Sequence, residues 1–226
     1  MIYENKFSKY LIYAIGEILL VVIGILIALQ VNNWNEKQKE STQEKEYLKG
    51  IRNDLRQDIN QSTIIVNSKI SALNIVESLE PYFKLLSKYK LQNIDTVNMK
   101  FIDLFHRGNS FRSTIGTYNS LIADGKSNLI NNRILFQKIQ TLYNIEYPRI
   151  NSIYEDLKLR ENNLAGKYSY EKFHWSYENL MKSGNKIMIS DIANFWENSQ
   201  FYCAFLDDSK VKMKSIIAEI DLELEK

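Results

Sequence analysis

The 226-residue chain carries 29 Lys and Arg against 27 Asp and Glu, and this balance argues against a sequence-independent nucleic-acid binder. Its 45% hydrophobic and 25% charged residues are ordinary for a globular protein and exclude a mainly disordered chain. It has two prolines and eight glycines, so we expect helices throughout. The single cysteine, Cys203, excludes an internal disulfide and a thiolate metal site, and its aromatic neighbours predict a buried thiol.

The first expected element is a membrane-spanning helix over residues 10–34, which follows a short tail over residues 1–9. Its apolar run extends over residues 10–31 and contains one charged side chain, Glu17. About 20 apolar residues in a helix cross the roughly 30 Å of bilayer hydrocarbon, so the length fits a single span. The run is too long for a cleaved signal peptide and no small-x-small site follows it, so we expect an uncleaved anchor. Aromatic residues gather at membrane–water interfaces, and the expected interfacial anchors are Tyr10, Tyr13 and Trp34.

Glu17 is the most informative residue of this span, because a carboxylate within hydrocarbon costs about 2.5–3.5 kcal/mol on insertion scales. Gly24 and Ala28 lie on the same helix face and form a small-xxx-small pair, which lets two backbones approach closely. We predict that this face contacts a second helix, from another copy or another protein. Two other interpretations of Glu17 stay open, a proton-relay carboxylate and a side chain that reaches toward the near headgroups. The interface face is defined by steps of three and four residues and comprises Ala14, Glu17, Val21, Gly24 and Ala28.

A polar helical stalk over residues 35–47 and a helical bundle domain over residues 48–226 are expected next. The bundle begins with an apolar stripe at helical spacing, and Pro81 predicts a break after it. The residues of the stripe are Leu48, Ile51, Leu55, Ile59, Val66, Ile70, Leu73 and Val76.

The remaining helices are placed by their breakers and caps. Two short helices are expected over 97–106 and 113–123, and longer ones over 128–146, 149–165 and 168–181. A pair of helices from residue 190 to residue 224, with a joint at Asp207–Asp208, completes the prediction, and residues 186–189 are expected to be extended. The predicted fold is all-α, one transmembrane helix followed by an irregular antiparallel helical bundle.

No constellation in the chain is typical of an enzyme. His106 and His174 have no further ligands at metal-binding spacing, and no glycine-rich phosphate loop or nucleophile motif is present. We therefore expect no catalytic residue, cofactor, metal or small-molecule substrate. The aromatic residues between 168 and 177 are interpreted as bundle core with half-exposed tyrosines, with a partner groove as the alternative.

Two stretches resemble an uncharacterised family of single-span membrane proteins common in the Bacteroidetes. The first is KYLIYAIGEILLVVIGILIALQVNNWNEKQK, residues 9–39, with the family's YAIGEI…VVIGILIAL…NNWNE signature; the second is TYNSLIADGKSNLINNRILFQKIQTLYN, residues 117–144. The resemblance implies a cytoplasmic N-terminus and a periplasmic helical domain, although this chain has a shorter basic lead, Lys6 and Lys9. The lysines that follow the span, counted alone, indicate the opposite orientation. The family has no known activity, so it assigns no catalytic residue.

The sequence thus predicts a non-enzymatic module, anchored in the bacterial inner membrane by one span, that binds or scaffolds other proteins. Its expected partners are the lipid bilayer and a helix in the membrane, with no nucleic acid. The alternative is a subunit of an ion-coupled or sensory membrane complex in which Glu17 is functional.

Overall fold

The computed structural model describes residues 6–77, 101–106 and 108–226, and every regular element in these ranges is a helix. The all-α prediction is therefore confirmed. The chain divides into two compact units, Met1–Tyr47 and Leu48–Lys226.

The first unit is formed by the beginning of α1, whose bounds are Lys6–Glu77. Its most apolar window has a mean hydropathy of 2.6, and none of this window is buried. By length and composition, α1 is the one helix among the described residues that could cross a membrane. Between residues 31 and 41 the side chains of α1 are polar apart from Val31 and Trp34, and all are exposed.

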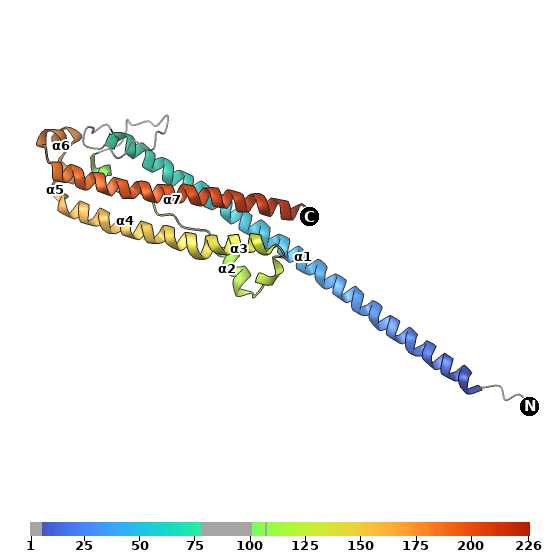
Figure 1. Cartoon of the computed structure of the whole chain (residues 1–226). Helices are drawn as coiled ribbons and strands as arrows, with labels where there is room; N and C mark the ends of the chain where they lie inside the picture. The colour runs from blue at the N-terminus through green and yellow to red at the C-terminus, as the bar shows by residue number, and fades with distance from the viewer. Residues whose placement is uncertain (1–5, 78–100, 107) are drawn as a thin grey trace, which may run out of the picture. The chain divides into compact units, whose positions relative to one another are not determined.

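The second unit is built around two antiparallel helices, α4 (Tyr147–Lys167) and α7 (Lys186–Leu224), which lie side by side in Figure 1. An ion pair joins Glu146, which precedes α4, to Lys212, and another joins Lys167 to Asp191. These two pairs join the start of α4 to the C-terminal half of α7 and the end of α4 to the start of α7, as expected for antiparallel helices. The shorter elements are η3 (Phe101–Phe105), α2 (Gly116–Ala123), η4 (Ser127–Leu129), α3 (Arg133–Thr141), η5 (Leu142–Glu146), α5 (Ser169–His174) and α6 (Tyr177–Ser183).

The part of α1 in this unit buries one face, as the apolar stripe predicts. Beyond Leu55, however, the buried positions differ from those of the predicted stripe. Leu48, Ile51 and Leu55 are buried, whereas Ile59 is half-buried. Asp58 and Ser62 are buried in its place. The steps of three and four residues continue through these polar residues to Ile65, so two polar side chains enter the core. Val66 is buried, while Ile70, Leu73, Val76 and Pro81 lie outside the described side chains.

Several expected boundaries are wrong. The helix expected over residues 168–181 is interrupted, since α5 ends at His174 and α6 begins at Tyr177. Pro148 does not separate two helices by a break, because η5 is a π-helical turn that leads directly into α4 and places the proline in its first turn. Residues 186–189 are helical, since the Asn185 side chain accepts a hydrogen bond from the Met188 N–H at 3.0 Å and caps α7. Asp207–Asp208 forms no joint, and α7 continues through it.

Helices α1 and α2 approach closely at Gly50. A Cβ atom at this position would lie 2.6 Å from Cγ2 of Thr117, which is closer than real Cβ atoms come to a neighbour. The absence of a side chain at residue 50 is therefore required by the packing.

Candidate functional site

Residues 108–115 form a segment without regular secondary structure that leads into α2, and its backbone is bound to its neighbours. Four backbone N–H groups, three in this segment and one in the first turn of α2, each donate a hydrogen bond to a side-chain oxygen. The pairs are Phe111 to the Tyr202 hydroxyl at 2.8 Å, Arg112 to Gln61 at 2.8 Å, Thr114 to Asp58 at 2.8 Å and Thr117, in α2, to Asp54 at 3.2 Å. We call residues 108–117 the strap.

Three of the four acceptors come from one face of α1. Asp54, Asp58 and Gln61 are spaced by four and three residues, so their side chains point in similar directions. Backbone N–H groups outside helices and sheets lack the partners that these elements provide, and a buried N–H without a partner is costly. The carboxylates and amide of α1 supply partners for this segment.

The Asp58 carboxyl is the deepest group of this arrangement, with 1% of the residue exposed. Its second oxygen accepts a hydrogen bond of 2.6 Å from the hydroxyl of Tyr147, which is itself buried. Burial raises the pKa of Asp58, the charge of Asp54 adds to the rise, and the hydrogen bonds from Tyr147 and Thr114 oppose it. Burial also raises the pKa of Tyr147, and the Asp58 charge adds to that rise, so its hydroxyl stays a donor.

Aromatic rings enclose this polar group. Phe111 packs against Tyr147 at 5.3 Å between ring centroids, and Tyr143 meets Tyr147 edge-on at 5.2 Å. Tyr143 is also stacked on Tyr118 at 4.4 Å. Because these rings exclude water, the hydrogen bonds of Asp58 are made in a medium of low dielectric constant, where they are strong and where losing one is costly.

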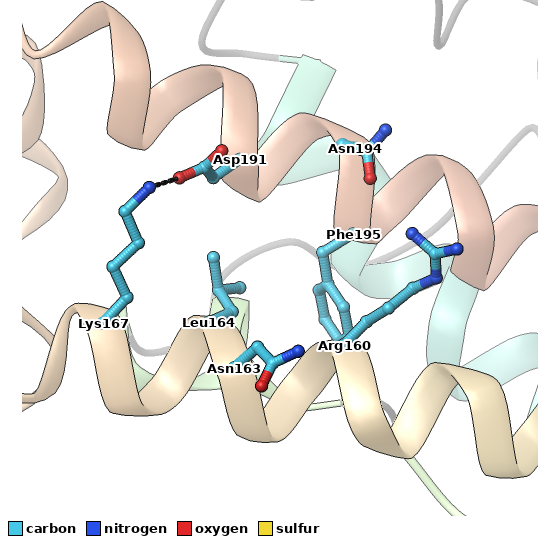
Figure 2. A pocket seen from close by; sticks show the side chains of 7 residues that line it. All are labelled: Arg160, Asn163, Leu164, Lys167, Asp191, Asn194 and Phe195. Carbon is cyan, nitrogen blue, oxygen red and sulfur yellow. Dashed lines mark hydrogen bonds and ion pairs between the residues drawn. The ribbon is translucent and has the colours of Figure 1, made fainter.

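A small polar pocket lies between α4 and α7 in the region of Lys167 and Asp191 (Figure 2). Its volume is about 280 Å³, and its floor contains the buried side chains of Leu164 and Phe195. Figure 2 shows Lys167 reaching from α4 to Asp191 on α7. The lining residues are Arg160, Asn163, Leu164, Lys167, Asp191, Asn194 and Phe195.

The charges of this pocket are largely satisfied within the protein. Lys167 lies 2.5 Å from an oxygen of Asp191, and the Tyr168 hydroxyl donates to the same oxygen at 2.7 Å. The hydrogen bond from Lys167 lowers the pKa of Asp191, and the bond from Tyr168 also lowers it. Arg160 pairs with Asp156 at 2.8 Å. The arrangement therefore joins two helices, and no group in it is poised as a nucleophile or general base.

A larger, mostly apolar groove of about 560 Å³ lies between α3, η5 and the C-terminal half of α7. Ile134 and Val211 line it and are each 67% exposed. Lys138 and Lys212 also line it, and each pairs with an acidic side chain, Glu219 and Glu146 respectively.

The residues expected in the membrane are all exposed on α1. The interfacial anchors Tyr10, Tyr13 and Trp34 are exposed, as are the residues of the interface face, Ala14, Glu17, Val21, Gly24 and Ala28. A Cβ atom built at Gly24 would have no other atom within 4 Å, so nothing in the described chain occupies that position. Contact of this face with a second helix stays a prediction.

Both histidines lie against polar groups of the protein, and the cysteine is buried. His106 lies 3.3 Å from Glu161 through Nδ1, and Nδ1 of His174 lies 2.8 Å from the carbonyl of Tyr170. Cys203 is buried, which confirms its prediction. Within residues 6–77, 101–106 and 108–226, no group of three or more His, Cys, Asp or Glu side chains could hold a metal ion.

The aromatic residues between 168 and 177 do not all lie in the core. Tyr168 is buried, but Tyr170 and Phe173 are exposed. The expectation of a core position is therefore wrong for Phe173, and Tyr170 is more exposed than the half-exposed tyrosines that were expected.

Sequence reasoning missed the strap and its acceptors. The signal that could have located them is the spacing of the buried face of α1, which passes through Asp58 and Ser62 at steps of three and four residues. A charged residue at a core position of a helix implies a buried partner. The partners themselves, Thr114 and Tyr147, are distant in the sequence and carry no local signature.

Comparison with known families gives a match over most of the chain. The model of a family of unknown function, DUF6090, matches residues 17–209, from within the apolar run of α1 to the middle of α7. No match was found among curated proteins or among solved structures. The match covers most of the chain, and the protein therefore belongs to this uncharacterised family.

Proposed function

We propose that the protein is a membrane-anchored helical module that binds or scaffolds other proteins at the bacterial inner membrane, with its bundle in the periplasm. The observation that supports the membrane anchor in this proposal is the exposed apolar run of α1, whose most apolar window has a mean hydropathy of 2.6 and is not buried at all.

The energetic argument for an anchor rests on the size of this exposed surface. Leaving one large aliphatic side chain in water costs about 1.5–3 kcal/mol relative to burying it. Soluble monomers rarely expose contiguous apolar patches larger than a few hundred Å². The run contains many exposed Leu, Ile and Val side chains on every side of the helix. A bilayer removes all of them from water at once.

Two measurements test the anchor and its orientation together. We expect the full chain to be extracted from membranes only with detergent, and a chain lacking residues 1–31 to be soluble and strongly helical by circular dichroism. A cysteine placed at Lys39 should react with a membrane-impermeant thiol reagent while the inner membrane is intact. The wild-type chain is the control, because its single cysteine, Cys203, is buried. Labelling at residue 39 only after the inner membrane is broken would place the bundle in the cytoplasm.

The proposed partner within the membrane is a second helix that packs on the interface face. Glu17 supports this, because a carboxyl group in hydrocarbon is stabilised by a polar contact. Gly24 and Ala28 support it independently, because small residues four apart permit close backbone approach. Both features lie on one side of α1.

Self-association through this face is tested by a cysteine scan over residues 11–29. Crosslinking should peak at residues 17, 21, 24 and 28. Gly24→Leu should weaken association, whereas the matched control Gly16→Leu, off the face, should have less effect. Glu17→Gln should largely preserve association, and Glu17→Leu should weaken it by about 1 kcal/mol. The absence of crosslinks at every position would show that the helix does not pair with a second copy.

A further inference from the structure

The strap is held on α1 by the carboxyl group of Asp58, which is buried. Burial ordinarily favours the neutral form of a carboxyl group. The Thr114 N–H donates to one oxygen of Asp58, and the Tyr147 hydroxyl donates to the other. With 1% of the residue exposed, water contributes little to solvating a negative charge on Asp58. The hold on the strap at Thr114 therefore depends directly on a buried ionisable group.

The titratable groups around this carboxyl are themselves acids. Asp54 lies one turn earlier on α1, Tyr143 lies in η5, and Tyr147 begins α4. The strap also contains Arg112. The contact of this residue with α1 is made by its backbone N–H, which donates to Gln61. Among the described residues, the charge that acts on the pKa of Asp58 is that of Asp54, which has the same sign.

We propose that Asp58 is a proton-controlled latch, which holds the strap more firmly on α1 when the carboxyl is protonated and less firmly when it is ionised. In the protonated form, one oxygen still accepts from the Thr114 N–H. The carboxyl O–H donates to the Tyr147 oxygen in a reversed bond, so no charge is buried, while the Tyr147 hydroxyl hydrogen gives up its acceptor on Asp58. In the ionised form both contacts are kept, but a negative charge is buried close to Asp54.

The direction of the pH effect follows from linkage. The pKa of Asp58 is raised in the folded protein above its ordinary value of 3.8. The protonated carboxyl therefore favours the closed strap, and closure weakens as the pH rises from the ordinary pKa through the raised one. Above the raised pKa the effect is complete and constant. Each unit by which the closed-state pKa exceeds the open-state value changes the opening equilibrium by about tenfold.

The test is hydrogen exchange of the full chain in detergent, followed by mass spectrometry between pH 4.5 and 7.5. The rates of peptides that cover residues 108–117 are corrected for the intrinsic pH dependence and divided by those of a buried α7 peptide, residues 192–206. We expect strap protection, measured as this ratio, to fall as the pH rises. In Asp58→Asn, whose amide cannot ionise, the ratio should be flat and protection at pH 7.5 should equal or exceed that of the wild type.

Asp156→Asn is the matched control, because Asp156 is an exposed acid on α4 outside the strap, and it should keep the wild-type pH dependence. The proposal is overturned if the wild-type ratio does not change with pH, or if Asp58→Asn shows the same change as the wild type. The second outcome would assign the pH dependence to a group other than Asp58. Should Asp58→Asn fail to fold, the wild-type profile and Asp54→Asn decide the question, since removing the like charge should shift the fall in protection to lower pH.

Discussion

Trp196→Ala is expected to lower the free energy of unfolding of the bundle by about 3–5 kcal/mol, the usual range for removing a buried large aromatic side chain. Trp196 is 1% exposed, and its indole N–H donates to the carbonyl of Leu104 at 2.9 Å. The substitution leaves a cavity beside the N-terminal third of α7 and also removes the donor from a buried carbonyl. Urea denaturation of residues 36–226, followed by circular dichroism, measures the loss.

Two variants separate the parts of this effect. Trp196→Phe keeps most of the volume and loses the hydrogen bond, so it should cost less than Trp196→Ala by more than 1 kcal/mol. Phe201→Ala is the control on the same helix, because Phe201 is 57% exposed, and it should change stability by less than about 0.5 kcal/mol. A loss for Phe201→Ala as large as that for Trp196→Ala would contradict the packing of α7.

Asp58→Ala should lower the free energy of unfolding by about 2–3 kcal/mol at neutral pH. The alanine leaves the Tyr147 hydroxyl and the Thr114 N–H without an acceptor, and each buried donor that loses its partner costs about 1–3 kcal/mol. The cost is partly offset, because the variant no longer buries a carboxylate. Chemical denaturation at pH 7 gives the value.

Asp58→Asn distinguishes lost hydrogen bonds from lost charge. The amide oxygen can accept from the Thr114 N–H, and the amide NH₂ can donate to the Tyr147 oxygen, so both contacts have a substitute. We expect a change of less than about 1 kcal/mol, in either direction. Equal losses for the alanine and asparagine variants would mean that the charge itself holds the strap.

The helical class and the membrane-compatible helix could be predicted from the sequence because both are local properties. The apolar run of α1 is continuous along the chain. Glycine and proline, which disfavour helices, are scarce in the sequence. The core positions Leu48, Ile51 and Leu55 followed from helical spacing alone. The burial of Cys203 followed from its immediate neighbours.

Boundaries were less predictable because tertiary context decided them. Proline usually marks a helix break, but the π-helical turn before α4 places Pro148 in the first turn, where no N–H is required. The pair Asp207–Asp208 resembles a turn, yet Leu206 and Ser209 beside it are buried on α7, so packing keeps the helix continuous. By hydrophobicity alone, Ile59 is the expected core residue at this turn. Asp58 is buried instead, because Thr114 and Tyr147, which are distant in the sequence, donate hydrogen bonds to its carboxyl group.

The strap itself could not have been predicted, although the spacing along α1 places Asp58 at a core position. Its acceptors on α1 lie 51–63 positions from the N–H groups they bind, and Tyr147 lies 89 positions from Asp58. Polar residues that bind backbone N–H groups impose no pattern on the residues that they bind. Only the three-dimensional arrangement brings Asp58, Thr114 and Tyr147 together.

The close approach at Gly50 makes residues 50 and 117 a single steric unit. Glycine within a helix costs about 0.5–1 kcal/mol relative to alanine, so α1 accepts a weaker helix at this turn in exchange for contact with Thr117. A methyl group added at residue 50 requires the Thr117 side chain to shift or to be shortened. The two positions, 67 residues apart in the chain, are therefore sterically coupled, and their combined side-chain volume influences how near α2 can lie to α1.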